Sequence, residues 1–257
     1  MEKKINRREL VTLVGGVAAA GLASSLVSAA DHSSAASSTG IPWPYKPLDP
    51  DAVGQRAYES YLKGHCMYGP FEAIVGTLAD KYGAPYKDFP SAMFKYGAGG
   101  VNGWATLCGS LNGSAAAIQL LSPDPSPLID SLMSWYQIEA LPNFYPKGAK
   151  FPEVRSVAGT PLCHESIAHW TKAAKRKAYS PERAERCGTL TASVARKTVQ
   201  LLNDQSAGKA LTGFTASKQT QGCMGCHEKG GVVENIRTKM DCGGCHTEQF
   251  KGGHPKM

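Results

Sequence analysis

The sequence predicts a mainly α-helical protein, and three observations support this. Apolar residues recur at the three- and four-residue spacing of amphipathic helices, most clearly over residues 70–83. No segment shows the apolar–polar alternation of a half-buried strand. Prolines and glycines divide the chain into segments of helical length, and two of these begin with Thr-Pro or Ser-Pro, pairs typical of a helix N-terminus. The hydrophobic share of 42% is ordinary for a globular protein.

The predicted helices follow one another from residue 51 to about residue 203. The first is expected to open at Asp51. The third contains no charged residue and many small ones, which predicts a buried central helix that neighbours approach closely. The predicted ranges are 51–64, 70–83, 104–121, about 128–136, the segment that follows Thr160-Pro161, and the segment from Ser180-Pro181 to about Asn203.

Residues 1–30 are typical of a targeting segment, and residues 31–50 of a linker. Four basic residues precede a mild apolar run over residues 10–26, and small residues follow it. The stretch Asn6–Val11 resembles a twin-arginine signal, with Leu10 in place of the usual Phe. An uncleaved membrane anchor is the alternative. Because the apolar run is short and weakly apolar for a membrane span, we expect periplasmic export by the twin-arginine route without stable membrane insertion. Because that route carries folded proteins, it also favours a cofactor assembled before export.

Two C-x-x-C-H motifs lie near the C-terminus, and each is the attachment signature of a c-type haem. The motif cysteines bind the porphyrin through thioethers, and the motif histidine is the proximal iron ligand. The expected sites are Cys223, Cys226 and His227 for one haem, and Cys242, Cys245 and His246 for a second. Segment 207–257 is polar and glycine-rich, as expected of a small, irregular haem-binding segment with little core of its own.

A four-cysteine zinc ribbon is the alternative reading, because fifteen residues separate Cys226 from Cys242. It would leave two histidines at the same offset unexplained, so haem is favoured. The formal charge is +7, of which the leader contributes part. Haem propionates would bring the loaded chain close to neutral, which removes the electrostatic basis for nucleic-acid binding.

Four further cysteines, Cys66, Cys108, Cys163 and Cys187, need a separate explanation. Their separations of 42, 55 and 24 residues say little by themselves about what they bind. We expect Cys66 to open a helix, Cys108 to lie inside the glycine-rich helix, and the other two to lie in first turns. Helix N-termini favour thiolates, so the four residues are candidate ligands of an iron–sulfur cluster. Two structural disulfides remain the alternative in an exported protein.

The chain also resembles known families. The pattern covering residues 60 to about 203 resembles the C-GCAxxG-C-C family of redox proteins, although Met67-Tyr68 replaces the usual Ala-x and no charged turn precedes Cys108. With its C-x-x-C-H motifs and leader, the whole chain resembles the split-Soret cytochrome c family, periplasmic dihaem cytochromes of sulfate-reducing bacteria. The pattern consists of Gly64-His65-Cys66, Gly99–Gly103 followed by Cys108–Gly113, Cys163, and Arg186-Cys187-Gly188.

This resemblance implies a homodimer whose four haems cluster near its interface, with bis-histidine ligation of the irons. It also implies an iron–sulfur cluster of the [2Fe-2S] type in the cysteine-bearing domain, residues 51–206. His164 and His254 are the first candidates for distal haem ligands, with His65 and His169 behind them.

The expected function is one-electron transfer between redox protein partners by two haems c and a cluster. Bis-histidine ligation would keep substrates away from the irons and lower their reduction potentials relative to His/Met ligation. Two alternatives stay open. One is a haem enzyme with an open iron site, such as a peroxidase or a small-oxyanion reductase. The other is a redox sensor that contains disulfides. No catalytic residue can be selected from the sequence for either.

Overall fold

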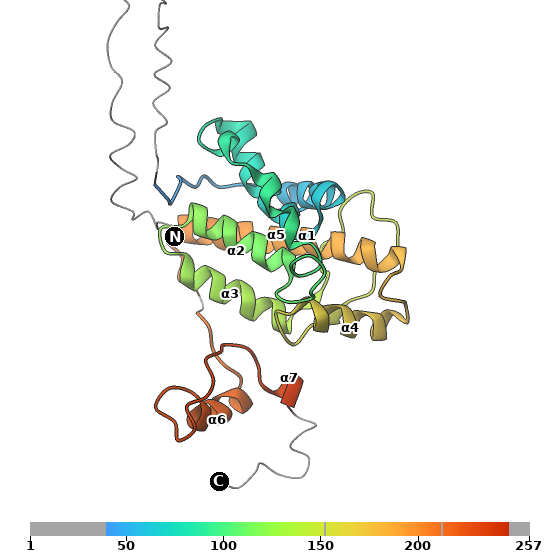
Figure 1. Cartoon of the computed structure of the whole chain (residues 1–257). Helices are drawn as coiled ribbons and strands as arrows, with labels where there is room; N and C mark the ends of the chain where they lie inside the picture. The colour runs from blue at the N-terminus through green and yellow to red at the C-terminus, as the bar shows by residue number, and fades with distance from the viewer. Residues whose placement is uncertain (1–39, 152, 212, 247–257) are drawn as a thin grey trace, which may run out of the picture. The chain divides into compact units, whose positions relative to one another are not determined.

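A computed structural model describes residues 40–151, 153–211 and 213–246 (Figure 1). The leader and His254 lie outside the described residues. Helices dominate, as predicted. The elements are α1 (Pro50–Tyr82), η1 (Tyr86–Asp88), η2 (Ser91–Gly97), α2 (Gly109–Leu121), α3 (Pro125–Ile138), β1 (Ala140–Leu141), β2 (Ser156–Val157), α4 (Cys163–Ala174), α5 (Pro181–Ser206), α6 (Lys218–His227) and α7 (Gly243–His246).

Helix α1 joins the first two predicted helices end to end. Its N-cap is Asp49 rather than Asp51: the Asp49 carboxylate accepts the backbone N–H groups of Asp51 and Ala52 at 2.9 and 3.3 Å. The helix breaks at His65, whose φ of 65° is left-handed. The break explains why the pattern predicted two helices, because residues on either side of it follow separate helical repeats.

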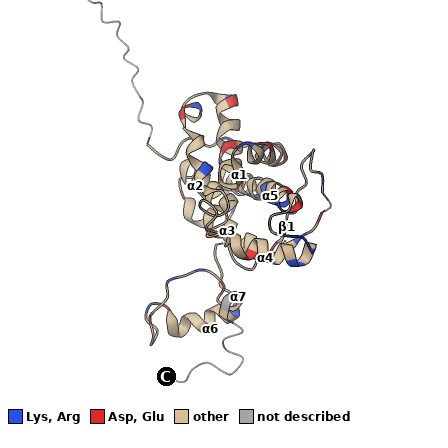
Figure 2. Ribbon diagram, turned by 45° about the vertical axis from the view of Figure 1, so that its right-hand side comes forward, with Lys and Arg blue, Asp and Glu red and all other residues tan. Residues whose placement is uncertain are grey.

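Helices α2 and α5 form the centre of the body with α1. Helix α5 packs along α1, and α2 packs against both. The predicted start of α5 is confirmed: the Ser180 hydroxyl accepts the Arg183 N–H at 3.2 Å, and Pro181 is the first helical residue. Helix α2 begins at Gly109, five residues later than expected. It carries no Lys, Arg, Asp or Glu, and the charged residues of the body lie on other elements (Figure 2).

Helix α4 begins two residues later than the predicted Thr160-Pro161 start. Its N-cap is Leu162 and its first residue is Cys163. Leu162 is instead in an isolated antiparallel bridge with Leu107, which keeps the chain extended up to that point. The sequence also gave no sign of β1 and β2, which pair Ala140 with Val157. Two-residue strands are too short for an alternating pattern to reveal them.

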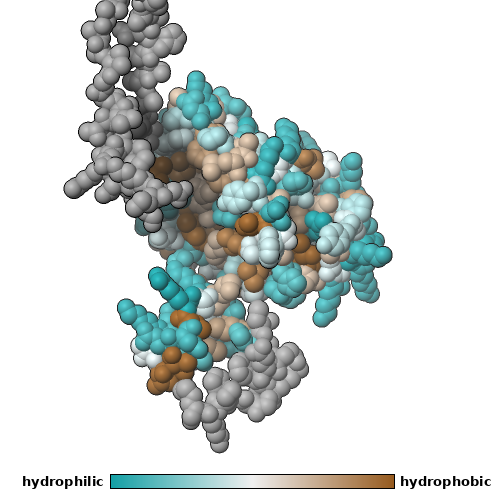
Figure 3. Space-filling model, in the orientation of Figure 1, coloured by the Kyte–Doolittle hydropathy of each residue, from teal (hydrophilic) through white to brown (hydrophobic). Residues whose placement is uncertain are grey.

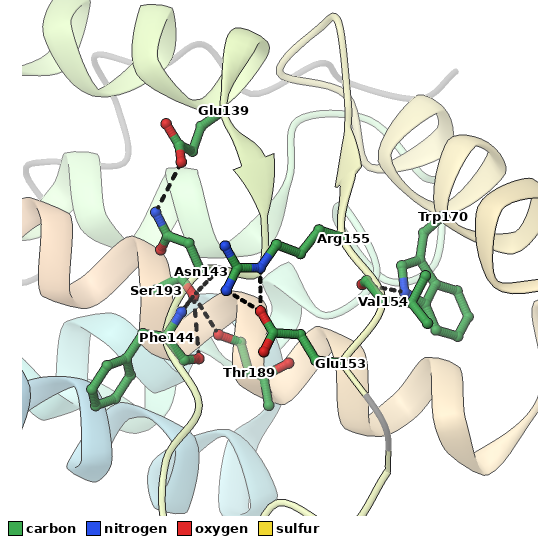
Figure 4. A network of polar contacts seen from close by, with 9 residues as sticks. All are labelled: Glu139, Asn143, Phe144, Glu153, Val154, Arg155, Trp170, Thr189 and Ser193. Atoms are coloured by element: carbon green, nitrogen blue, oxygen red, sulfur yellow. Dashed lines mark hydrogen bonds and ion pairs between the residues drawn. The ribbon is translucent and has the colours of Figure 1, made fainter.

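The loop between β1 and β2 is fastened to α4 and α5 (Figure 4). The Ser193 hydroxyl of α5 accepts the backbone N–H groups of Asn143 and Phe144, both at 3.1 Å. The indole N–H of Trp170 donates to the Val154 carbonyl at 3.1 Å. Arg155 and Glu153 form an ion pair beside these bonds. These bonds hold the loop in place against the N-terminal half of α5.

The core of the body is apolar and drawn from α1, α2, α3 and α5. Side chains from the lead-in also reach it: Leu48 is buried, and the Trp43 N–H donates to the Leu120 carbonyl at 2.7 Å. The largest fully buried side chains of these helices include Phe71, Ile74, Leu78, Leu111, Ile118, Leu121, Leu128, Leu132, Tyr136 and Leu202.

The C-terminal segment carries α6 and α7 and has almost no core. Among its described residues, only Thr220 is buried. Apolar residues accordingly reach its surface (Figure 3), and Val232 is 77% exposed. A segment with so little buried apolar surface gains little stability from its own packing.

Candidate functional site

Cys66 follows directly after the break in α1. His65 leaves the helical region there, so Cys66 starts the second half of the helix. The thiol is buried and lies 3.8 Å from the Gly97 carbonyl. The expectation that Cys66 opens a helix is therefore confirmed.

Cys108 and Cys163 are brought together by the bridge between Leu107 and Leu162. The Cys108 N–H donates to the Pro161 carbonyl at 2.9 Å, and the Cys163 N–H donates to the Thr106 carbonyl at 2.7 Å. Cys108 is the N-cap of α2 rather than a residue inside it, and Cys163 is the first residue of α4. Both sulfurs thus lie at helix N-termini, where the helix dipole favours a thiolate.

Cys187 lies in the second turn of α5, not in the first as expected. Together with Cys66, Cys108 and Cys163 it lines one cavity of about 80 Å³. All four are free thiols, three of them buried and Cys187 half-buried. Over the described residues, no three Cys, His, Asp or Glu side chains lie close enough to chelate a single metal ion. The four thiols therefore line a cavity and do not form a site for one metal ion.

The protonation of these thiols follows from their burial. Burial, with the neighbouring Cys108 and Cys187, raises the pKa of Cys66 to about 12. Burial and the other three cysteines raise the pKa of Cys163 to about 12, against an opposing effect of Arg186. Without a bound cation both residues are neutral thiols at pH 7, so any metal that binds must displace their protons.

The loop before Cys108 has an unusual backbone. Five consecutive residues, Gly99–Gly103, have positive φ, and so does Ala105. Val101 is the most strained of them, because a β-branched residue rarely adopts a left-handed conformation. The turn is closed by the Gly103 and Ala105 N–H groups, which donate to the Ala98 and Gly99 carbonyls, both at 2.9 Å. The Gly99 N–H points to the Cys66 sulfur and lowers the pKa of that thiol, against the dominant effect of burial.

Gly109 is required by the close approach of α2 to Cys66. A Cβ atom at residue 109 would lie 2.6 Å from the Cys66 sulfur and 2.7 Å from the Gly97 carbonyl oxygen. No side chain larger than hydrogen fits there without displacing the cysteine.

In the C-terminal segment, both C-x-x-C-H motifs end a helix on their histidine: α6 ends at His227 and α7 at His246. In α6 the residues Cys223, Cys226 and His227 have the i, i+3, i+4 spacing that places three side chains on one face. Nothing is described of the Cys245 side chain.

Asn235 orients His227, a role that the sequence did not reveal. The Nδ1 atom of His227 lies 2.9 Å from Oδ1 of Asn235. Because an amide oxygen only accepts, Nδ1 carries the proton, and the ring lone pair is on Nε2. The turn that brings Asn235 back is held by the His227 carbonyl, which accepts the Asn235 and Ile236 N–H groups at 3.0 Å. That turn is not visible in a sequence pattern.

Thr220 connects the two motifs. Its hydroxyl accepts the Cys242 N–H at 3.2 Å. Burial raises the pKa of the Cys242 thiol, the hydrogen bond with Thr220 opposes the rise, and the neighbouring Cys223 adds to it. One cysteine of each motif therefore lies beside one cysteine of the other.

The candidate distal histidines are spread over the body. The His164 side chain is 71% exposed, with Nε2 3.8 Å from a Glu165 carboxylate oxygen. The Nδ1 atom of His169 lies 2.9 Å from the Val157 carbonyl oxygen. His65 lines the cysteine cavity and packs edge-on against the Tyr61 ring. Helices within the described ranges are all too short or too polar to cross a bilayer.

Comparison with known proteins agrees with these features. Residues 68–201 match the family described as "Putative redox-active protein (C_GCAxxG_C_C)", a range that includes three of the four cysteines and begins two residues after Cys66. Split-Soret cytochrome c of Desulfovibrio desulfuricans is 37% identical over 265 residues, which cover 95% of each chain.

A solved structure of split-Soret cytochrome c from Desulfovibrio desulfuricans ATCC 27774, reported for a novel iron centre, superposes with a TM-score of 0.74. It is 36% identical, and the match covers 79% of this chain and 90% of that one. The chain therefore belongs to the split-Soret cytochrome c family.

Proposed function

We propose that this protein is a periplasmic dihaem c-type cytochrome that carries single electrons and also holds a [2Fe-2S] cluster. The observation that carries the proposal is the repeated C-x-x-C-H motif, each copy ending a helix on its histidine, in a chain of this family. Covalent attachment would fix each haem, and the iron would exchange the electron.

The residues of the first motif fit a haem. Cys223 and Cys226 would form the thioethers, and His227 would bind the iron through Nε2, since Nδ1 is bonded to Asn235. Cys242, Cys245 and His246 would hold the second haem. Because Cys242 and Cys223 are neighbours, the two porphyrins would be attached close to each other, which suits electron exchange between them.

The four body cysteines fit a cluster better than a single ion. Sulfurs around one tetrahedral zinc lie about 4 Å apart, as follows from the usual Zn–S distance. Here Cys66, Cys108, Cys163 and Cys187 surround a cavity instead, and three of them lie at helix N-termini that stabilise negative charge. The novel iron centre reported for the related protein supports the presence of an iron centre in this chain.

The remaining assignments complete the proposal. His164 and His254 are the proposed distal ligands, and the exposure of His164 would let it reach a haem of a second subunit in a homodimer. The proposed division is a twin-arginine-type leader over 1–30, a linker over 31–50, the cluster-binding body over 51–206 and the haem-binding segment over 207–257. His164→Ala should then convert one haem to high spin, and two low-spin haems in that variant would exclude His164.

Spectroscopy and analysis of the purified protein test the function. We expect covalent mass for two haems per chain, low-spin spectra for both irons, and additional iron with acid-labile sulfide. A high-spin ferric component with rapid cyanide or CO binding would favour the haem enzyme instead. A colourless protein that contains zinc would overturn the proposal.

A further inference from the structure

Arg186 is a buried cation for which the described part of the chain supplies no ion-pair partner. Its side chain is 5% exposed, and arginine stays protonated at any pH a protein experiences. Its Nη1 atom donates to the Ser166 hydroxyl at 3.0 Å, while Nε and Nη2 are buried without a hydrogen-bond partner. No ion pair among the described residues includes Arg186. Burial of an unpaired charge is strongly unfavourable, so we expect an anion to bind next to the Arg186 guanidinium.

Two acidic residues, Glu182 and Glu185, line a cavity together with Arg186, but both have other partners. Glu185 accepts the Tyr58 hydroxyl at 2.9 Å and the Lys150 N–H at 2.8 Å. Glu182 forms an ion pair with Arg176 at 3.1 Å. Both carboxylates line a second cavity, of about 100 Å³, that also reaches Arg186. Their negative charge makes that cavity a poor site for a further anion.

The cysteine cavity is the better place for the missing charge. Arg186 lines it, directly precedes Cys187, and is bonded to Ser166, which also lines it three residues after Cys163. The Ser166 hydroxyl is itself fixed by the buried Tyr136 hydroxyl at 2.9 Å, so the guanidinium has a defined position.

We propose that Arg186 is the charge partner of the iron–sulfur centre and raises its reduction potential. This inference rests on the proposed cluster at the four cysteines. Four thiolates and the inorganic sulfides carry more negative charge than the irons carry positive charge, so such a centre is anionic. It becomes more so when it takes up one electron. A cation held beside it stabilises the reduced state more than the oxidised state, since the net charge near a cluster is one determinant of its potential.

The test compares Arg186→Met with Arg186→Lys, which keeps the charge. The control is Arg183→Met: Arg183 lines the same cavity, but it is only half-buried and its guanidinium donates to the Ala178 carbonyl. The potential of the cluster is measured by an EPR-monitored titration of the full-length protein. We expect Arg186→Met to weaken electron uptake at least tenfold, or 59 mV for one electron. Arg186→Lys should retain most of the wild-type potential, and Arg183→Met should shift it by less than half as much.

A second readout uses thermal unfolding with and without the cluster. Loading should raise the unfolding midpoint more in the wild type than in Arg186→Met, because only the wild type gains a compensated charge. Equal gains in unfolding midpoint, or equal potentials, in Arg186→Met and the wild type would overturn the inference.

If Arg186→Met does not retain a cluster, Arg186→Lys decides the question. Cluster loading of Arg186→Lys supports the role of charge, and failure of this folded variant to load the cluster refutes it. Stabilisation of the cluster-free wild type, but not of Arg186→Met, by inorganic phosphate would assign the guanidinium to a different anion. Wild-type protein without iron and sulfide beyond its haems would instead refute the cluster itself.

Discussion

Asn235 decides which nitrogen of His227 can serve as an iron ligand. Its amide oxygen accepts the proton on Nδ1, 2.9 Å away, and a hydrogen-bonded imidazole is a more basic ligand. The C-x-x-C-H motif predicts the ligand from sequence but not this support, because the contact depends on the turn between residues 228 and 234. Motif spacing thus identifies the residues that would hold a cofactor, whereas the residues that orient them come only from the structure.

Replacement of Asn235 should change the potential of one haem. Asn235→Ala removes the acceptor, makes His227 less basic and should raise the potential by up to about 59 mV, a tenfold change in electron uptake. Asn235→Asp keeps an acceptor and should leave the potential equal or lower. A spectroelectrochemical titration measures both variants, and a shift in the same upward direction for both would contradict this role.

Gly109 offers a test of the cysteine site at a residue that is no ligand. In Gly109→Ala the new methyl group would meet the Cys66 sulfur at 2.6 Å, so the cluster should be lost and the body destabilised by about 1–3 kcal/mol. Gly222→Ala is the control, because a Cβ atom there has no neighbour within 4 Å. Acid-labile sulfide and denaturant unfolding provide the measurements. Full sulfide content in Gly109→Ala would mean that the thiols do not bind the cluster in this arrangement.

Among the elements, helix starts were predictable where one side chain determines them. Ser180 and Pro181 begin α5 as expected, because capping and the φ of proline act locally. Thr160 and Pro161 carry the same signal but do not begin α4. The pairing of Leu162 with Leu107, which is distant in sequence, keeps this stretch extended, so tertiary contact overrides the local preference. The same pairing moves Cys108 from the helix interior to its N-cap.

The left-handed turn over Gly99–Gly103 makes a prediction about stability. Val101 is 37% exposed and loses little packing on truncation, while its positive φ is unfavourable for a β-branched side chain. Val101→Gly should therefore stabilise the cluster-free protein by up to about 1 kcal/mol, after the entropy of glycine is included. Asn102→Gly should bring no comparable gain, because asparagine tolerates this conformation. A lower thermal midpoint for Val101→Gly than for the wild type would show that the side chain contributes packing that outweighs the strain.

In the molecule as a whole, the proposed cofactors belong to two segments that differ in how much apolar surface they bury. The body buries an apolar core, whereas the segment with α6 and α7 buries only Thr220 among its described residues. The helical class of the body and the burial of its central helix α2 follow from the sequence pattern. The meeting of four cysteines does not, because their separations reveal nothing about distance in the fold.

Single cysteine replacements in the two segments should have separate effects. Cys163→Ala should abolish acid-labile sulfide and leave two covalent haems, because the proposed cluster and the proposed haems are bound by different cysteines. Cys226→Ala should weaken or prevent attachment of one haem and leave the sulfide content unchanged. Intact mass and sulfide analysis distinguish these outcomes. Loss of both kinds of cofactor in either variant would show that the two segments depend on each other.

The bridge between Leu107 and Leu162 should also form late as the chain folds. It joins positions more than fifty residues apart, and such non-local contacts form late because the intervening chain must first be closed into a loop. Until they form, a nascent or partly unfolded chain cannot present the full set of thiols to iron. Acid-labile sulfide retained in the body, which the proposed haems do not supply, would therefore report that the body has completed its folding, and sulfide content would be a simple assay of folding quality for variants of this protein.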